Sequence, residues 1–374
     1  MGERTQAGAG STKWSATMTG LKPLFRQPLN YLLLIIPFAL VADLAHWSSV
    51  LVFALSALAI IPLAKLLGDA TEALAVYTGA RLGGLLNATM GNAAELIITI
   101  AAIRAGLLDL VKASITGSII ANLLLVMGFA VLLGGLRNGL QHFHRPSAGL
   151  AASQLALAII ALAIPTAFSQ AIEPNHHAVE LLSDNVALVM LAIYGLYLIF
   201  TLQGQAGGSP SLAHEDGGLS WSKGTAVVVL LLSTATIAWL SEVLVGAVEE
   251  TVATLGLSEF FVGIIIIPIV GNAAEHFVAV TSAIDNKMEL SMSISLSSSM
   301  QVALFVAPLL VFISLFAGPE QLDLVFHPFE LAALGTSTLI ASLIALDGES
   351  NWIEGAQLLA VFLIIAIAFF FLPV

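Results

Sequence analysis

The chain has 374 residues, of which 58% are hydrophobic and only 10% are charged, and its formal net charge is −12. Soluble domains carry about 25% charged residues, so this composition excludes a globular protein with a water-exposed surface. The acidic balance argues against a nucleic-acid-binding protein, and the absence of cysteine excludes disulfides and thiolate metal sites.

The apolar residues form long continuous runs rather than the alternating pattern of an outer-membrane barrel. Runs of about 17–25 apolar residues predict membrane-spanning helices, and hence an all-α polytopic membrane protein. Eleven transmembrane helices are predicted, at residues 29–45, 50–67, 80–103, 112–134, 149–168, 179–202, 224–245, 259–283, 289–316, 325–346 and 353–373.

These spans predict five parts of the chain, which are a cytoplasmic N-terminal tail (1–28), an extra N-terminal helix (29–45), a five-helix unit (50–202), a polar cytoplasmic linker (203–223) and a second five-helix unit (224–374). The positive-inside rule predicts a cytoplasmic N-terminus and a C-terminus outside. In that orientation only Arg104 and Lys112, of the 12 Lys and Arg residues, lie outside.

One short sequence occurs twice in the chain, as MGNAAEL (90–96) and as VGNAAEH (270–276). The shift that takes Gly91 to Gly271 also takes Ser118 to Ser298. Because each unit has an odd number of spans, the two units are predicted to be inverted-topology repeats. Inverted repeats with polar interruptions at matching positions are typical of secondary transporters, which bind their substrate near the midplane.

Each copy places a glutamate, Glu95 or Glu275, near the centre of an apolar span. A carboxylate there costs roughly 2.5–3.5 kcal/mol on insertion scales, and no Lys or Arg lies mid-span to pair with it. We therefore expect protons or a cation from solution to neutralise both groups. A protonated, purely structural acid is the alternative, which the duplication and the central position disfavour.

The residues before each glutamate predict a break in the helix. Gly91 and Gly271 tolerate an opened helix, and Pro268 removes a backbone donor. Asn92 and Asn272 precede the glutamates by three positions and so share their helical face, although they could merely cap the break. Carboxylate, amide and backbone oxygens together form a ligand set that suits Ca²⁺.

A second polar layer is predicted on the spans that follow. Its members are Ser118 and Asn122 on span 112–134, Ser298 and Gln301 on span 289–316, and His276 beside Glu275. We expect them to complete or orient the ion site. The serines could instead be close-packing surfaces, and His276 is either a proton carrier or a packed polar neighbour.

In these residues the sequence resembles the calcium/proton exchanger (CAX) family of the calcium/cation antiporter superfamily. The matching segments are GGLLNATMGNAAELI (83–97), GSIIANLLLVMG (117–128), PIVGNAAEHFVAV (268–280) and SSMQVALFVAP (298–308). The resemblance implies ten core helices plus one N-terminal helix, alternating access, and Ca²⁺ efflux driven by inward proton movement. By motif, Glu95 and Glu275 would be the shared Ca²⁺/H⁺ site and the neighbouring polar residues its surroundings.

The alternatives are a Na⁺-driven antiporter of the same fold, a passive cation channel and, least favoured because the sequence holds no catalytic motif, a membrane enzyme. As an antiporter the chain is expected not to be an enzyme and to need no cofactor besides the transported Ca²⁺ and H⁺. Its surroundings are expected to be a lipid bilayer, the inner membrane of a bacterium, with no nucleic-acid partner. The sequence leaves a homo-oligomer open.

Overall fold

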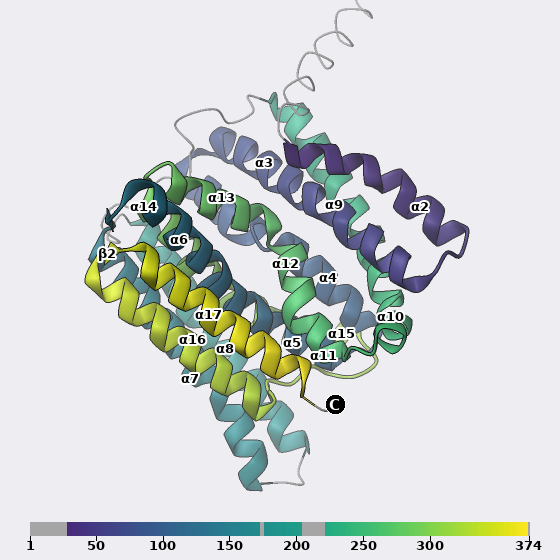
Figure 1. Ribbon diagram of the computed structural model, residues 1–374. Helices are drawn as coiled ribbons and strands as arrows, with labels where there is room; N and C mark the ends of the chain where they lie inside the picture. Colours follow the sequence, from purple (N-terminus) through teal and green to yellow (C-terminus); the bar gives the residue numbers. More distant parts are fainter. Residues whose placement is uncertain (1–27, 173–175, 204–220, 373–374) are drawn as a thin grey trace, which may run out of the picture.

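The computed structural model describes residues 28–172, 176–203 and 221–372, and these residues are helical almost throughout (Figure 1). The predicted helical class of the chain is confirmed. In chain order the helical segments are η2 (Pro28–Ile35), α2 (Ile36–Leu44), α3 (Ser49–Met90), α4 (Ala93–Arg104), α5 (Leu108–Ile120), η3 (Ala121–Val126), α6 (Met127–Asn138), α7 (Arg145–Ile172), α8 (His176–Leu202), α9 (Lys223–Gly246), α10 (Val248–Leu255), α11 (Glu259–Phe261), η4 (Val262–Ile266), α12 (Ile267–Gly271), α13 (Ala273–Ile284), α14 (Met288–Gln301), η5 (Val302–Val306), α15 (Ala307–Ala317), α16 (Pro328–Asp347) and α17 (Trp352–Phe370).

Within the described residues, 8 helical stretches are long and apolar enough to cross a membrane, by length and composition. They are Ser49–Gly79, Leu108–Asn138, Arg145–Ser169, His177–Leu202, Lys223–Gly246, Met288–Ala317, Pro328–Asp347 and Trp352–Phe370. The pair Val248–Leu255 and Glu259–Gly271, bent by 110°, would make 9 if it is one span. The predicted spans 80–103 and 259–283 are each interrupted, so neither forms one continuous helix.

The predicted end of the second span at residue 67 is wrong, because α3 runs on to a kink at Gly79. Lys65 donates to Asp69 one turn later at 2.8 Å, and both side chains are largely covered. An (i, i+4) ion pair of this kind stabilises a helix, and it lies across the predicted end of the span. Gly79 has a φ of 82°, which side-chain-bearing residues rarely adopt, so the kink falls there.

A two-stranded antiparallel sheet was not predicted. Gln141–His142 (β1) pairs with Glu349–Ser350 (β2), so the α6–α7 connection is tied to the α16–α17 connection. This β1–β2 pair marks one end of the molecule (Figure 1).

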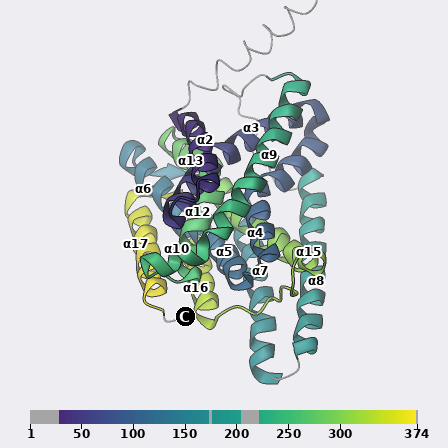
Figure 2. The same cartoon turned by 90° about the vertical axis from the view of Figure 1, so that its right-hand side faces the viewer.

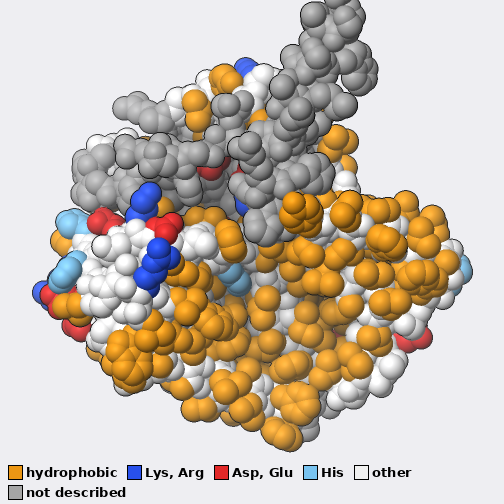
Figure 3. Space-filling view, turned by 45° about the horizontal axis from the view of Figure 1, so that its top comes forward, with side chains coloured by type: hydrophobic (Ala, Val, Ile, Leu, Met, Phe, Trp, Pro, Cys, Tyr) orange, Lys and Arg blue, Asp and Glu red, His pale blue; other side chains and the backbone are white. Residues whose placement is uncertain are grey.

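The helices pack around one large apolar core, and a smaller apolar cluster lies between α3 and the start of α9. Helix α3 lies along α9, α17 lies against α6, and α16 lies against α7 (Figures 1 and 2). Figure 3 shows that hydrophobic side chains also cover much of one outer face. Exposed apolar side chains such as Phe316, which is 91% exposed, are expected where a protein meets lipid.

Candidate cation site

Two interrupted helices form the centre of the candidate site. Helix α3 ends at Met90 and α4 begins at Ala93, with Gly91 and Asn92 between them. In the second half, α12 ends at Gly271 and α13 begins after Asn272. Each break therefore places a glutamate in the first turn of a new half-helix, where the helix dipole favours negative charge.

The glutamate side chain of each half lies against the glycine of the other half. A Cβ placed on Gly91 would lie 3.3 Å from Oε1 of Glu275. A Cβ placed on Gly271 would lie 3.2 Å from Cγ and 3.7 Å from Oε1 of Glu95. Each glutamate thus packs against the glycine of the other copy of the motif, and any larger side chain at either glycine would meet it.

The central acids have no basic partner among the described residues. Glu95 is only 4% exposed, and neither of its carboxylate oxygens accepts a hydrogen bond. The Oδ1 atoms of Asn92 and Asn272 are likewise buried without a partner. The ion pairs of the described residues involve neither Glu95 nor Glu275. Buried acceptors left in this state have the arrangement that a bound cation would satisfy.

The amide donors of both asparagines are bound to the following helices. Nδ2 of Asn92 donates to Oε1 of Gln301 at 2.7 Å. Nδ2 of Asn272 donates to Oγ of Ser118 at 3.1 Å and to the carbonyl of Pro268 at 3.2 Å. Because the NH₂ groups are engaged in this way, the amide oxygens remain available as ligands.

Ser298 links Glu275 to the first half of the chain. Its hydroxyl donates to Oε2 of Glu275 at 2.6 Å and accepts from Nδ2 of Asn122 at 3.1 Å. Glu275 is partly exposed whereas Glu95 is buried, so the two acids differ in both access and partners. His276 is separate from this network, since its Nε2 is buried without a hydrogen-bond partner.

Two features of the surroundings were not predicted. Thr99 donates to the carbonyl of Glu95 at 2.6 Å and so holds the first turn of α4. Asn122 lies in the π-helical segment η3, and Gln301 directly precedes the π-helical segment η5. A π-helical turn re-aims the side chains around it and is common at functional sites. Apart from Asn122 these segments are apolar, and their sequence does not distinguish a π-helix from an α-helix.

One further buried acid was also not predicted, and one of its carboxylate oxygens caps a helix. Glu330 is 1% exposed, and its Oε2 accepts from the backbone N–H of His327 at 2.8 Å, which caps α16. The capping pattern of a polar residue followed three positions later by glutamate could have revealed it.

The donor set is made of oxygen atoms. Among the described residues no group of three or more His, Cys, Asp or Glu side chains could hold a metal ion. A cation at this layer would therefore rely on two carboxylates together with amide oxygens. Hard cations such as Ca²⁺ take such ligands, whereas softer metals prefer nitrogen and sulfur.

The chain is similar to known proteins over most of its length. The family model described as "Sodium/calcium exchanger protein" matches residues 48–203 and 225–371. A Ca²⁺/H⁺ antiporter of Aphanothece halophytica is 47% identical over 359 residues, which are 92% of this chain and 96% of the relative.

Two solved structures are also similar. The structure of native YfkE has a TM-score of 0.79 and 40% identity, and the match covers 90% of this chain and 97% of that one. The crystal structure of the H⁺/Ca²⁺ exchanger CAX has a TM-score of 0.71 at 18% identity and covers 94% and 93%. The second likeness shows a shared fold alone.

Proposed function

We propose, from the premise that the chain belongs to the sodium/calcium exchanger protein family, that it exchanges Ca²⁺ for H⁺ across a membrane as a secondary transporter. The observation that carries the proposal is the pair of central carboxylates, one from each half of the chain, without a basic partner among the described residues. The 47% identity to a Ca²⁺/H⁺ antiporter supports the choice of ions.

Ca²⁺ binds, in this proposal, between the carboxylates of Glu95 and Glu275 and the amide oxygens of Asn92 and Asn272. Two carboxylates balance the charge of one divalent ion. The unpartnered oxygens of Glu95 and of both asparagines support this ligand set. Ser118, Asn122, Ser298 and Gln301 hold the ligands in place through the hydrogen bonds described above.

Exchange follows from competition for the same two carboxylates. Bound Ca²⁺ keeps both groups ionised, and protonation removes their charge and releases the ion. A change of access while the site is empty would move two bare carboxylates through a dry barrier, which costs much free energy. Only the Ca²⁺-loaded or the protonated site therefore changes its access, and this requirement couples the two fluxes.

The arrangement of the chain is proposed to be two inverted five-helix repeats after one N-terminal helix, eleven spans in all, with the N-terminus in the cytoplasm. Two observations support the duplication. The family model matches each half once, and η3 and η5 end at equivalent positions, Val126 and Val306, which are related by the same shift as Gly91 and Gly271. The proposed location is the inner membrane of a bacterium, as expected for a relative of a bacterial antiporter.

Ion fluxes into proteoliposomes test the function. The purified chain is reconstituted, and ⁴⁵Ca²⁺ uptake is measured when the interior is more acidic than the outside. Uptake should accumulate Ca²⁺ against its gradient, should alkalinise the interior, and should stop when a protonophore collapses the pH difference. Glu95→Gln and Glu275→Gln should each abolish the coupled uptake.

Two other outcomes would replace the proposal. Uptake that persists with the protonophore but follows a Na⁺ gradient would identify a Na⁺-driven antiporter. Ca²⁺ flux that is never driven uphill by any second ion would identify a passive channel.

A further inference from the structure

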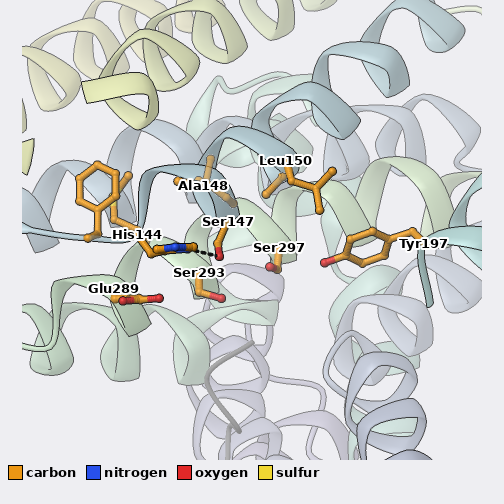
Figure 4. A pocket seen from close by; sticks show the side chains of 12 residues that line it. His144, Ser147, Ala148, Leu150, Tyr197, Glu289, Ser293 and Ser297 are labelled. Carbon is orange, nitrogen blue, oxygen red and sulfur yellow. Dashed lines mark hydrogen bonds between the residues drawn. The ribbon is translucent and has the colours of Figure 1, made fainter. Parts of the chain in front are cut away.

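A second polar feature lies outside the candidate cation site, where α7, α8 and α14 meet near the β1–β2 pair. It is a cavity of about 50 Å³, here called the α14 groove, and its polar lining is His144, Ser147, Tyr197, Glu289, Ser293 and Ser297 (Figure 4). A buried water needs about 10–15 Å³ of such space, so the groove has room for several waters.

The open end of the groove carries an imidazole and a carboxylate, those of His144 and Glu289. His144 is exposed, Glu289 is partly exposed, and both face the cavity (Figure 4). Nδ1 of His144 is hydrogen-bonded with Oγ of Ser147 at 2.8 Å. Deeper in the groove, the Tyr197 hydroxyl points toward Ser297 (Figure 4).

One face of α14 leads from the groove to the candidate cation site. Glu289, Ser293, Ser297 and Gln301 follow one another at every fourth position and so lie along one side of the helix. All four are partly exposed, whereas the stretch Ser298–Met300 between the last two is buried. The line ends at Gln301, whose side chain holds Asn92. From Glu289 to Gln301 the helix rises about 18 Å.

The walls of the groove continue inward with polar atoms that lack partners. Gln154 lies on α7, three positions beyond Ala151 of the groove lining, and its Oε1 is buried without a hydrogen bond. On α8 the Tyr194 hydroxyl is also buried without a partner, and its ring stacks on that of Tyr197 at 6.4 Å. Buried polar atoms of this kind are usually satisfied by water, so the structure calls for water beyond the groove as well as in it.

We propose that the α14 groove and its continuation past Gln154 and Tyr194 hold a file of water that carries protons to the Gln301–Asn92 layer. The inference rests on the proposed Ca²⁺/H⁺ exchange. Ca²⁺ needs six to eight oxygen ligands, and this groove offers one carboxylate, Glu289, beside the imidazole of His144 and the hydroxyl groups of serine and tyrosine. A proton needs only a chain of waters and hydroxyls. Protons and Ca²⁺ therefore reach the central carboxylates by different routes.

Thiol labelling tests whether water fills the groove. The chain has no cysteine, so Ser293→Cys and Ser297→Cys each introduce its only thiol. In open membrane fragments, a small charged thiosulfonate should label both variants and block exchange. Ser153→Cys, on the exposed side of α7, and Ser299→Cys, which is buried, are the controls and should resist the charged reagent. Reaction of Ser297→Cys with a lipid-soluble maleimide alone, or with neither reagent, would overturn the proposal.

A second measurement separates proton supply from Ca²⁺ binding. Gln154→Leu and Tyr194→Phe should lower the maximal exchange rate about tenfold while the affinity for ⁴⁵Ca²⁺ in detergent stays unchanged. Ser153→Leu is the matched control on α7 and should retain the wild-type rate. Wild-type rates in both groove variants, or a parallel loss of Ca²⁺ affinity, would contradict the route. Failure of the wild type itself to exchange Ca²⁺ for H⁺ would instead refute the proposed function.

Discussion

Glu275 lies against Gly91, although the two residues come from opposite halves of the chain, with its Oε1 3.3 Å from the point where a Cβ on Gly91 would stand. Glu95 has the matching relation to Gly271. The glycine of each motif thus makes room for the carboxylate of the other. The proposed Ca²⁺ site depends on this reciprocal packing, because it brings the carboxylates of Glu95 and Glu275 to one layer.

Replacing Gly91 tests that relationship. Gly91→Ala would place a methyl group 3.3 Å from Oε1 of Glu275 and 3.0 Å from the carbonyl of Asn87. We expect the carboxylate to be displaced and the apparent Ca²⁺ affinity to fall about tenfold, or roughly 1.4 kcal/mol. The control is Gly149→Ala on α7, where an added Cβ meets nothing within 4 Å. Equal Ca²⁺ affinities for the two variants, measured by ⁴⁵Ca²⁺ binding, would contradict the packing account.

The hydrogen bond from Ser298 to Glu275 should matter for binding. Ser298→Ala removes the donor that lies 2.6 Å from Oε2 of the carboxylate. A hydrogen bond to a charged group contributes about 1.5–3 kcal/mol, so the Ca²⁺ affinity should fall at least about tenfold. Protons should also compete more effectively, because the ionised form loses a stabilising contact.

The adjacent serine supplies the control for that change. Ser299 is buried and donates to the carbonyl of Ser295 at 2.8 Å, away from the acids. Ser299→Ala should leave Ca²⁺ titrations near the wild-type curve. An equal loss of affinity in both variants would assign the effect to packing of α14 rather than to the contact with Glu275.

The sequence predicted the central acids and their neighbours because chemistry and duplication marked them. Two glutamates in apolar spans are costly, and their recurrence in the same short motif identified matching positions in the two halves. The resemblance to calcium/proton exchangers is supported by the family match and by a relative at 47% identity. The metal-binding role of the residues remains a proposal.

Other features depend on contacts that no local pattern records. The second span was predicted to end at residue 67, but α3 continues past that point, where Lys65 pairs with Asp69. Apart from Asn122, the π-helical segments η3 and η5 consist of apolar residues that are equally common in α-helices. The packing of Glu275 on Gly91 follows from how the two halves cross, and residue spacing cannot supply that relation.

The two asparagines should respond differently to loss of their partners. The amide group of Asn92 donates to Gln301, whereas that of Asn272 donates both to Ser118 and to the carbonyl of Pro268. Gln301→Leu should therefore lower the Ca²⁺ affinity more than Ser118→Ala, by about threefold or more, since a neutral hydrogen bond contributes about 1 kcal/mol. Isothermal titration of both variants measures the order. The reverse order would contradict the roles given to these side chains.

The number of protons displaced by each bound Ca²⁺ tests the central claim most directly. Ca²⁺ is added to the purified, weakly buffered protein, and proton release is followed with a pH indicator. Because Ca²⁺ and protons compete for two carboxylates, release should approach two protons per Ca²⁺ at acidic pH, and Ca²⁺ affinity should rise with pH. The variants Glu95→Gln and Glu275→Gln should each release fewer protons per bound Ca²⁺. Tight Ca²⁺ binding without proton release, and with the same affinity at acidic and alkaline pH, would contradict the account.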